Sequence, residues 1–351
     1  ALTVAARAWS VIRIGPGHLF KSFQDPIDGS WPFREALQPY ARHSPLGPWI
    51  ADLLGISQSG MYVLLHLLVA TAALLIAGSW IASNTRDTEA KYTGIRLVFL
   101  APIAASLFTF LGNYDPWTVF LLAASMWAWS RGAVWSLIGV GLLLGVQHFE
   151  QSLTSVLVWA LTVSALSPKG HPRASRLAWL VVGIFAGKAL LSGLLLSLGL
   201  HPLEGRTSVF GDFLRDSVTG MLNFLPVFLL SMFAGLWGVV LTVAWQKRPL
   251  RRSLVAIVGL TIAVLAATVT LDHTRVFAVI IFPSLCYVIV SWLQSTRAEQ
   301  KSIRYVAEAV AWVIVPLQVF SSGPLTRVLD LNVLDRWIIL SLQLQEALML
   351  S

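Results

Sequence analysis

The sequence predicts an all-α protein, a polytopic bundle of about 10–12 transmembrane helices that forms a single transmembrane domain over residues 1–351. Hydrophobic residues make up 56% of the chain and charged residues 12%, and the mean hydropathy of +0.73 excludes an ordinary soluble protein. Apolar runs long enough to cross a bilayer alternate with short polar connections. The net charge of +8 comes from Lys and Arg clusters in these connections, which indicates contact with anionic membrane lipids rather than nucleic acid.

The longest polar segment, residues 17–60, precedes the first clear span and is expected to be an extracytoplasmic loop. Within it, WPFREALQPYA and SPLGPWIADLLG have the amphipathic pattern of short helices that lie on the membrane. Residues 1–16 are apolar but carry Arg7 and Arg13, so we expect either an interfacial helix there or a transmembrane segment upstream.

Residues 61–320 are expected to form the bundle. Between 97 and 166, four apolar pieces are separated by GNYDP, SRG and QHFEQ. The second and third pieces have cores of only about 20 Å, against about 30 Å of hydrocarbon, so their polar ends should lie at the membrane margin and face protein or a water-filled cavity. The other expected spans are 61–83, 177–199, 222–245, 253–270, 276–293 and 305–320. In the tail, 321–351, residues 333–350 either cross the membrane or lie on its surface.

The distribution of Lys and Arg predicts the orientation. These residues are concentrated in alternate connections, which the positive-inside rule assigns to the cytoplasm: 84–96, 130–132, 167–176, 246–252 and 294–304. The opposite connections hold nearly all the acids and histidines suited to chemistry. We therefore expect a multi-pass protein of the bacterial inner membrane whose active site faces outward.

Asp25 and Asp28 are the candidate catalytic residues. They lie three residues apart in QDPIDGSW, where Pro26 and Gly29 favour turns. A carboxylate that is partly desolvated at a membrane cavity becomes more basic and can accept a proton from a hydroxyl nucleophile. The alternative is that either aspartate is a turn residue that caps the following helix.

Asp115 in GNYDPW, and His148 with Glu150 in VQHFEQS, are candidate substrate-binding residues. Ionisable groups near membrane depth usually face an internal cavity. The alternative is that they lie in loop tips exposed to water. His66, within the first span, is expected to be a hydrogen-bonded core histidine rather than a ligand.

The segment LDHTR places Asp272, His273 and Arg275 in one turn between two apolar spans. An arginine on the external face runs against the charge bias, so it should have an anionic partner, either a loop carboxylate or a phosphate. Lys188 lies near the middle of an apolar span without an acid and is expected to point inward, where it could bind an anionic headgroup.

Several chemistries are excluded. The single cysteine, Cys286, lies in an apolar run, which argues against redox chemistry and Cys-rich metal sites. There is no GxxxxGK[ST], GxGxxG or HExxH motif, so we predict no cofactor and no metal site, although acidic loop residues could bind a divalent cation. Tryptophans near the ends of runs are expected to anchor the protein at the membrane interfaces: Trp49, Trp80, Trp117, Trp129, Trp245 and Trp292.

The long first external loop, the short irregular spans that follow and the motifs QDPIDGSW, GNYDP and LDHTR resemble the GT-C class of membrane glycosyltransferases. The resemblance implies inverting transfer of a sugar from a polyprenyl-phosphate carrier to a glycan or lipid acceptor, in glycan biosynthesis of the cell envelope. Asp28 or Asp25 would be the general base, while Arg275, Lys188 and His148 would stabilise the departing phosphate.

Three other functions are compatible with the sequence. A transporter or flippase for a lipid-linked or anionic solute would use GNYDP and QHFEQ as helix interruptions and Lys188 as a cargo ligand. An external polysaccharide polymerase or ligase would depend on Arg and His more than on a loop carboxylate. In a structural membrane subunit without enzymatic activity, the external acids would serve assembly.

Overall fold

The computed structural model describes residues 44–324, with gaps at 57, 110–111, 168–173, 198–205, 247–248, 271, 297–300, 315, 317–318 and 321–322. The described secondary structure is helical apart from two short antiparallel strands, β1 (Val319–Phe320) and β2 (Gly323–Pro324). The prediction of an all-α bundle is confirmed. Asp25, Asp28, the segment WPFREALQPYA and residues 333–350 lie outside the described residues.

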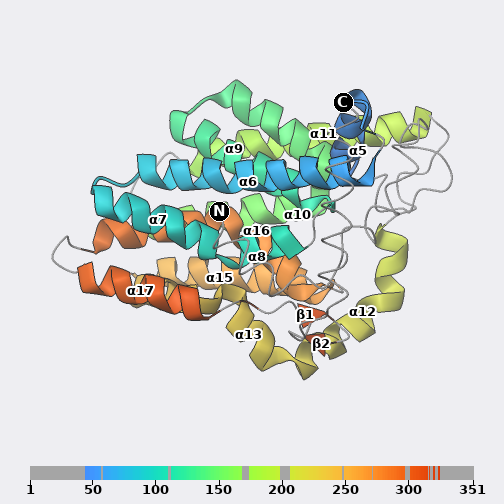
Figure 1. Ribbon diagram of the computed structural model, residues 1–351. Coiled ribbons are helices and arrows are strands. Elements are labelled where there is room, and N and C mark those ends of the chain that lie inside the picture. Colours follow the sequence, from blue (N-terminus) through green and yellow to red (C-terminus); the bar gives the residue numbers. More distant parts are fainter. Residues whose placement is uncertain are drawn as a thin grey trace.

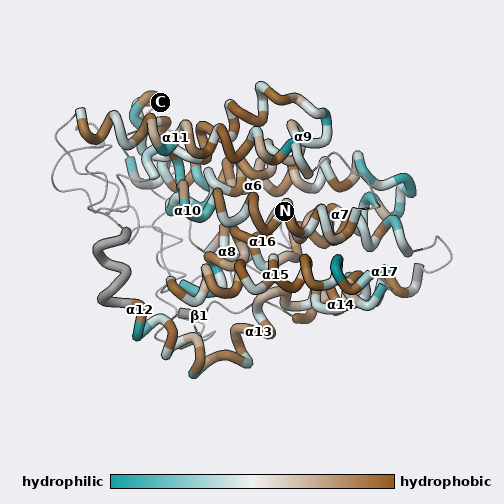
Figure 2. The backbone as a smooth tube through the Cα atoms, turned by 180° about the vertical axis from the view of Figure 1, so that it is seen from behind, coloured by the Kyte–Doolittle hydropathy of each residue, from teal (hydrophilic) through white to brown (hydrophobic). Residues whose placement is uncertain are grey.

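Most of the long helices run side by side (Figure 1), with hydrophobic residues along their lengths and hydrophilic residues mainly towards the two ends (Figure 2). In the described part of the chain, six helical segments are long and apolar enough to cross a membrane, and a seventh candidate is a pair of helices bent by 48°. The helices are α5 (Leu46–Leu53), α6 (Ser59–Ser83), α7 (Thr88–Leu100), α8 (Pro102–Thr109), α9 (Asp115–Arg131), α10 (Val134–Leu166), η1 (Ala174–Arg176), α11 (Leu177–Ser197), α12 (Arg206–Asn223), α13 (Leu225–Phe233), η2 (Ala234–Leu236), α14 (Trp237–Trp245), α15 (Leu250–Thr268), α16 (His273–Ser295) and α17 (Lys301–Val313).

Connections that the charge pattern assigns to the same side of the membrane do meet at one end of the bundle. The Gln294 side chain donates to the Asn84 carbonyl at 2.9 Å, and the Gln246 side chain donates to the Ser295 hydroxyl at 2.8 Å. These contacts join the connections after α6, α14 and α16. The alternation of spans on which the orientation was predicted is thus consistent with the fold.

Helix α10 is two limbs joined by a sharp reversal. His148 has non-helical backbone angles (φ −164°, ψ 83°), and the Ser152 hydroxyl donates to the Leu144 carbonyl at 3.3 Å. Residues eight apart in a straight helix are separated by about 12 Å, so the chain must fold back at His148. The predicted break at QHFEQ is therefore present, and the first limb, from Val134 to Gln147, is only about 20 Å long.

Glycines bring the first limb of α10 against α11. A Cβ added to Gly141 would lie 2.4 Å from the Leu180 carbonyl oxygen, and one added to Gly145 would lie 2.0 Å from that of Ile184. On α11, Gly187 is equally close to the carbonyl of Leu142. Contacts that advance in the same direction along both chains show that the two helices are parallel, with their backbones in direct contact.

The span predicted over 222–245 is interrupted at its centre. Helices α13 and α14 are separated by η2, where Ala234 has a positive φ of 47°. A Cβ added to the next residue, Gly235, would lie 2.3 Å from the Ala311 Cα of α17, so α17 packs directly against this break. The Trp237 indole donates to the Leu229 carbonyl at 2.9 Å, which satisfies one acceptor that the interruption leaves.

The connection predicted over 84–96 is wrong in its extent, because α7 already begins at Thr88. The Asp87 side chain accepts a hydrogen bond from the Glu89 backbone, and its carboxylate pairs with Arg304 at 2.5 Å. Arg96, one turn before the end of α7, pairs with Glu308 at 2.5 Å. These partners from α17 allow charged residues within the helix.

The prediction that the tryptophans anchor the membrane interface is wrong for most of them. Trp245 is exposed, but Trp80, Trp129 and Trp292 are almost completely buried. The Trp129 ring lies 5.2 Å from that of Trp159 and therefore belongs to an aromatic cluster inside the bundle. Packing between helices, rather than the headgroup region, explains these side chains.

Candidate functional site

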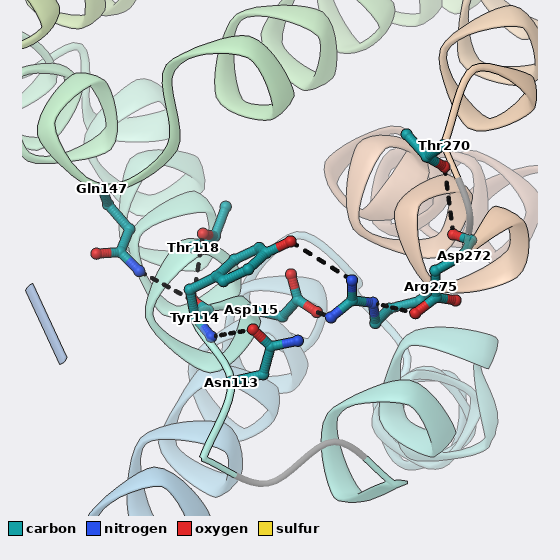
Figure 3. Close-up of polar contacts among 8 residues, drawn as sticks. All are labelled: Asn113, Tyr114, Asp115, Thr118, Gln147, Thr270, Asp272 and Arg275. Carbon is teal, nitrogen blue, oxygen red and sulfur yellow. Dashed lines mark hydrogen bonds and ion pairs between the residues drawn. The ribbon is translucent and has the colours of Figure 1, made fainter. Parts of the chain in front are cut away.

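The site is built around Arg275, in the first turn of α16. Its guanidinium contacts two carboxylates, with Nε 2.5 Å from Asp272 Oδ2 and Nη1 3.2 Å from Asp115 Oδ2 (Figure 3). Asp272 occupies the N-cap position of α16, while Asp115 is the first residue of α9 and not part of a loop. The side chains are at most 12% exposed. The anionic partner predicted for Arg275 is thus a pair of carboxylates from two helices.

Two carboxylates facing one guanidinium leave a net negative charge in a buried place. Burial raises the pKa of Asp272 to about 6, although the neighbouring Arg275 charge opposes this shift. The Oδ1 atom of Asp272 has no hydrogen-bond partner among the described residues. Asp272 is therefore able to exchange a proton close to neutral pH.

Tyr114 connects this charged group to α10. The Tyr114 hydroxyl accepts a hydrogen bond from Arg275 Nη2 at 3.4 Å, and the His148 ring lies 4.9 Å from the Tyr114 ring. The Gln147 amide donates to the Tyr114 carbonyl at 3.0 Å (Figure 3). It also accepts from the Leu46 backbone at 3.1 Å, which ties α5 to the site. Sequence reasoning missed Tyr114 and Gln147, although both lie in the motifs GNYDP and QHFEQ.

A second charged group follows at the turn of α10. Glu150 lies 3.8 Å from His148 Nδ1 and 3.8 Å from the Lys188 ammonium, which also lies 5.6 Å from the centre of the Phe149 ring. The side chains of Lys188 and Glu150 are 26% and 52% exposed. The expected inward orientation of Lys188 is thus only partial, and its acidic neighbour comes from α10 instead of its own helix.

The two other histidines considered lie in the core. His273 Nδ1 is 3.0 Å from the Ala267 carbonyl oxygen, and its ring packs 6.2 Å from that of Phe228. The structure therefore places His273 against α13 and α15, unlike its neighbours Asp272 and Arg275. His66 pairs through Nδ1 with the Tyr62 carbonyl at 2.8 Å and accepts from the Trp117 indole at 3.2 Å. The prediction of a satisfied core histidine at position 66 is confirmed.

The charged residues are recessed relative to the end of α6. Trp117, near the start of α9, is level with His66, which lies seven residues, or about 10 Å, from the start of α6 at Ser59. Helix α5 packs over this step, where Gly47 contacts both rings. The second part of the predicted 17–60 loop, SPLGPWIADLLG, is therefore a helix that covers the short end of α9.

The described residues include no group of three or more His, Cys, Asp and Glu side chains placed to hold a metal ion. The chemistry available in the described part of the site is that of carboxylates, a guanidinium, an ammonium, a phenol and an imidazole. Comparison with protein-family models, with curated proteins and with solved structures gives no match.

Proposed function

We propose that the protein is a membrane glycosyltransferase that takes its sugar from a polyprenyl-phosphate carrier. The observation that carries this proposal is the convergence of Asp115, His148, Lys188 and Arg275, from four helices, at one recessed end of a membrane bundle. Charged groups at membrane depth cost free energy, so side chains of this kind usually have a functional role. A lipid-borne phosphate sugar is a substrate that combines an apolar tail with groups that these side chains bind.

The reaction is a displacement at the anomeric carbon. The acceptor oxygen forms a bond to this carbon while the bond to the phosphate oxygen breaks, and the phosphate leaves with the electron pair. The acceptor proton passes to a carboxylate base, for which Asp28 and Asp25 are the candidates that the GT-C resemblance suggests. The sugar–phosphate bond supplies the driving force, so no nucleotide is required.

The structure divides the remaining roles by charge. Arg275 is already paired with Asp115 and Asp272, so we assign these three to binding sugar hydroxyls instead of holding the phosphate. Lys188 lies 3.8 Å from Glu150, beyond hydrogen-bond distance, and can turn towards a phosphate whose negative charge grows as it leaves.

The test is sugar transfer by the purified protein in liposomes that contain a polyprenyl-phosphate sugar and an acceptor, with release of polyprenyl phosphate as the readout. Asp28→Asn, Asp25→Asn and Asp272→Asn are compared with Asp216→Asn, which changes an exposed acid of α12. We expect a loss of at least about 100-fold for the base and little change for Asp216→Asn. Full activity of the first three variants, or no turnover by the wild type with any such donor, would refute the proposal.

A second candidate is a transporter, and one observation favours it. Below the reversal of α10, the side-chain oxygens of Gln151 and Ser155 are buried without a hydrogen-bond partner in the described chain, and so is the Ser284 hydroxyl of α16, a helix that packs against α10. Buried polar atoms of this kind are usually satisfied by water, which a solute path would contain. Flux of protons or phosphate into sealed proteoliposomes, reduced by Ser155→Ala, would support transport over transfer.

A further inference from the structure

Two arginines from different connections meet where α9 ends and α11 begins. Arg131 is the last residue of α9, and Arg176 is the last residue of η1, immediately before α11. The Arg176 guanidinium lies over Gly132, because a Cβ added to this glycine would be 2.8 Å from Nη1. Arg176 therefore packs on the residue that follows Arg131, at the helix end where the α9 dipole favours a cation.

This meeting point lies at the end of the bundle opposite the candidate site. The Trp117 indole donates to His66, and ten residues further along α9 the Trp127 indole donates to the Ile76 carbonyl of α6 at 3.1 Å. The contacts advance in the same direction along both chains, so α9 and α6 are parallel and end side by side. The charge pattern assigns the connections that follow both helices to the cytoplasm.

The two arginines have no acidic partner in the described part of the chain. Neither guanidinium forms an ion pair or a hydrogen bond with another described residue. Positions 116–203 contain a single acid, Glu150, which lies near the candidate site, and the sequence of the connection 167–176 adds Lys and Arg without Asp or Glu. Asp87 and Glu308 pair with other arginines, between α7 and α17. The positive charge is therefore available to an anion from outside the chain.

Tryptophans accompany the two arginines. The Arg131 guanidinium lies 4.8 Å from the centre of the Trp127 ring. Trp135, in the first turn of α10, is 84% exposed, and Trp179, in the first turn of α11, is 45% exposed. Exposed indoles next to guanidiniums at the end of a membrane bundle are typical of the depth at which lipid headgroups lie.

We propose that Arg131 and Arg176 bind the phosphate of an anionic glycerophospholipid from the leaflet at this end of the bundle. A guanidinium presents paired donors that match phosphate oxygens, and basic sites between spans on the cytoplasmic side bind acidic headgroups. Trp135 and Trp179 contact the glycerol and the upper acyl chains. The bound headgroup joins the end of α9 to the start of α11 and offsets the repulsion between the two cations. This inference does not depend on the proposed function.

The first experiment measures lipid binding by native mass spectrometry of the delipidated protein. The probes are dioleoyl phosphatidylglycerol, dioleoyl phosphatidylcholine and inorganic phosphate. Arg131→Gln and Arg176→Gln are each expected to weaken phosphatidylglycerol binding about fivefold, and Arg176→Lys is expected to weaken it less. Arg86→Gln removes the same charge from an exposed position next to Asp87, at the same end of the bundle, and should change nothing. Phosphatidylcholine should bind weakly, and inorganic phosphate should not compete.

A second measurement separates lipid binding from folding. Phosphatidylglycerol should raise the Tm of the wild type in micelles, and Arg131→Gln should lose most of this rise. Arg131 is exposed, so its Tm without lipid should stay close to that of the wild type. Equal binding of the two lipids, or unchanged phosphatidylglycerol binding by both glutamine variants, would overturn the proposal. Full competition by inorganic phosphate would also overturn it, because the site would then bind free anions instead of a lipid.

Discussion

Replacing Gly145 by alanine should separate α10 from α11 and disturb the site as well as the fold. Gly145 belongs to the first limb of α10, three residues before the reversal at His148. The added methyl group would lie 2.0 Å from the Ile184 carbonyl oxygen and 2.9 Å from the Lys188 nitrogen. Both obstacles are backbone atoms, so rotation of a side chain cannot relieve the overlap.

The size of the destabilisation by Gly145→Ala follows from the distance between the added methyl group and the Ile184 carbonyl oxygen. Ordinary contacts of a Cβ begin at 3.4 Å, so the helices must move apart by more than 1 Å at this point. Overpacking of this kind costs about 1–3 kcal/mol, and the greater helix propensity of alanine returns less than about 1 kcal/mol. We expect a net loss of about 2 kcal/mol in the free energy of unfolding, together with weaker lipid-phosphate binding because Lys188 is displaced.

The chain offers matched controls. A Cβ added to Gly139 on α10 or to Gly193 on α11 would meet nothing within 4 Å. The three alanine variants are compared by thermal unfolding in detergent micelles and by titration with polyprenyl monophosphate. Gly139→Ala and Gly193→Ala should be neutral or slightly stabilising. If Gly145→Ala were as stable as these controls, the backbone contact between α10 and α11 would be refuted.

Three other predictions concern charge and backbone strain. Asp272 has a raised pKa, so its contribution to stability is fully present below pH 3.8 and is lost as the pH rises through about 6. Asp272→Asn should remove this decline, about 2 kcal/mol in the free energy of unfolding measured between pH 4 and 7. Arg275→Gln removes the cation that pairs with two buried carboxylates and should cost about 3–5 kcal/mol at pH 8. The cost should be less at pH 5, where Asp272 is protonated, and an equal loss at both values would contradict this. Ala234→Gly should raise the free energy of unfolding by about 1 kcal/mol because glycine tolerates the positive φ. Ala263→Gly inside α15 should lower it by a similar amount, and thermal unfolding of both variants checks these two expectations.

Span positions and the alternation of the connections could be predicted because they depend on local hydrophobicity and charge. The predicted starts and ends at 61–83 and 177–199 lie within two residues of α6 and α11. The sharp reversal at His148 also had a local signal. The five polar or aromatic residues QHFEQ separate two apolar pieces, and the piece before them is too short to cross the bilayer by itself. Span positions and helix breaks of this kind can be predicted from the hydrophobicity pattern alone, because they do not depend on tertiary contacts.

Partners in the site could not be predicted, because they depend on contacts between distant residues. Arg275 and Asp115 are 160 positions apart, and the sequence could not distinguish a second carboxylate from a phosphate as the partner. Tyr114 is a single aromatic residue among many, and only the meeting of α9, α10 and α16 gives it a role. The catalytic candidates Asp25 and Asp28 lie outside the described residues, so their role stays a prediction.

The short helices that made the sequence difficult to assign are also what creates the recess. If α9 were as long as α6, Asp115 would lie about 10 Å nearer the end of the bundle, and Arg275 would have to bind it in water, where the pair would contribute little. The short first limb of α10 likewise lowers His148 and Glu150 to the level of Lys188 in the middle of α11. Lengthening either helix by one turn should therefore abolish lipid-phosphate binding even if the bundle still folds.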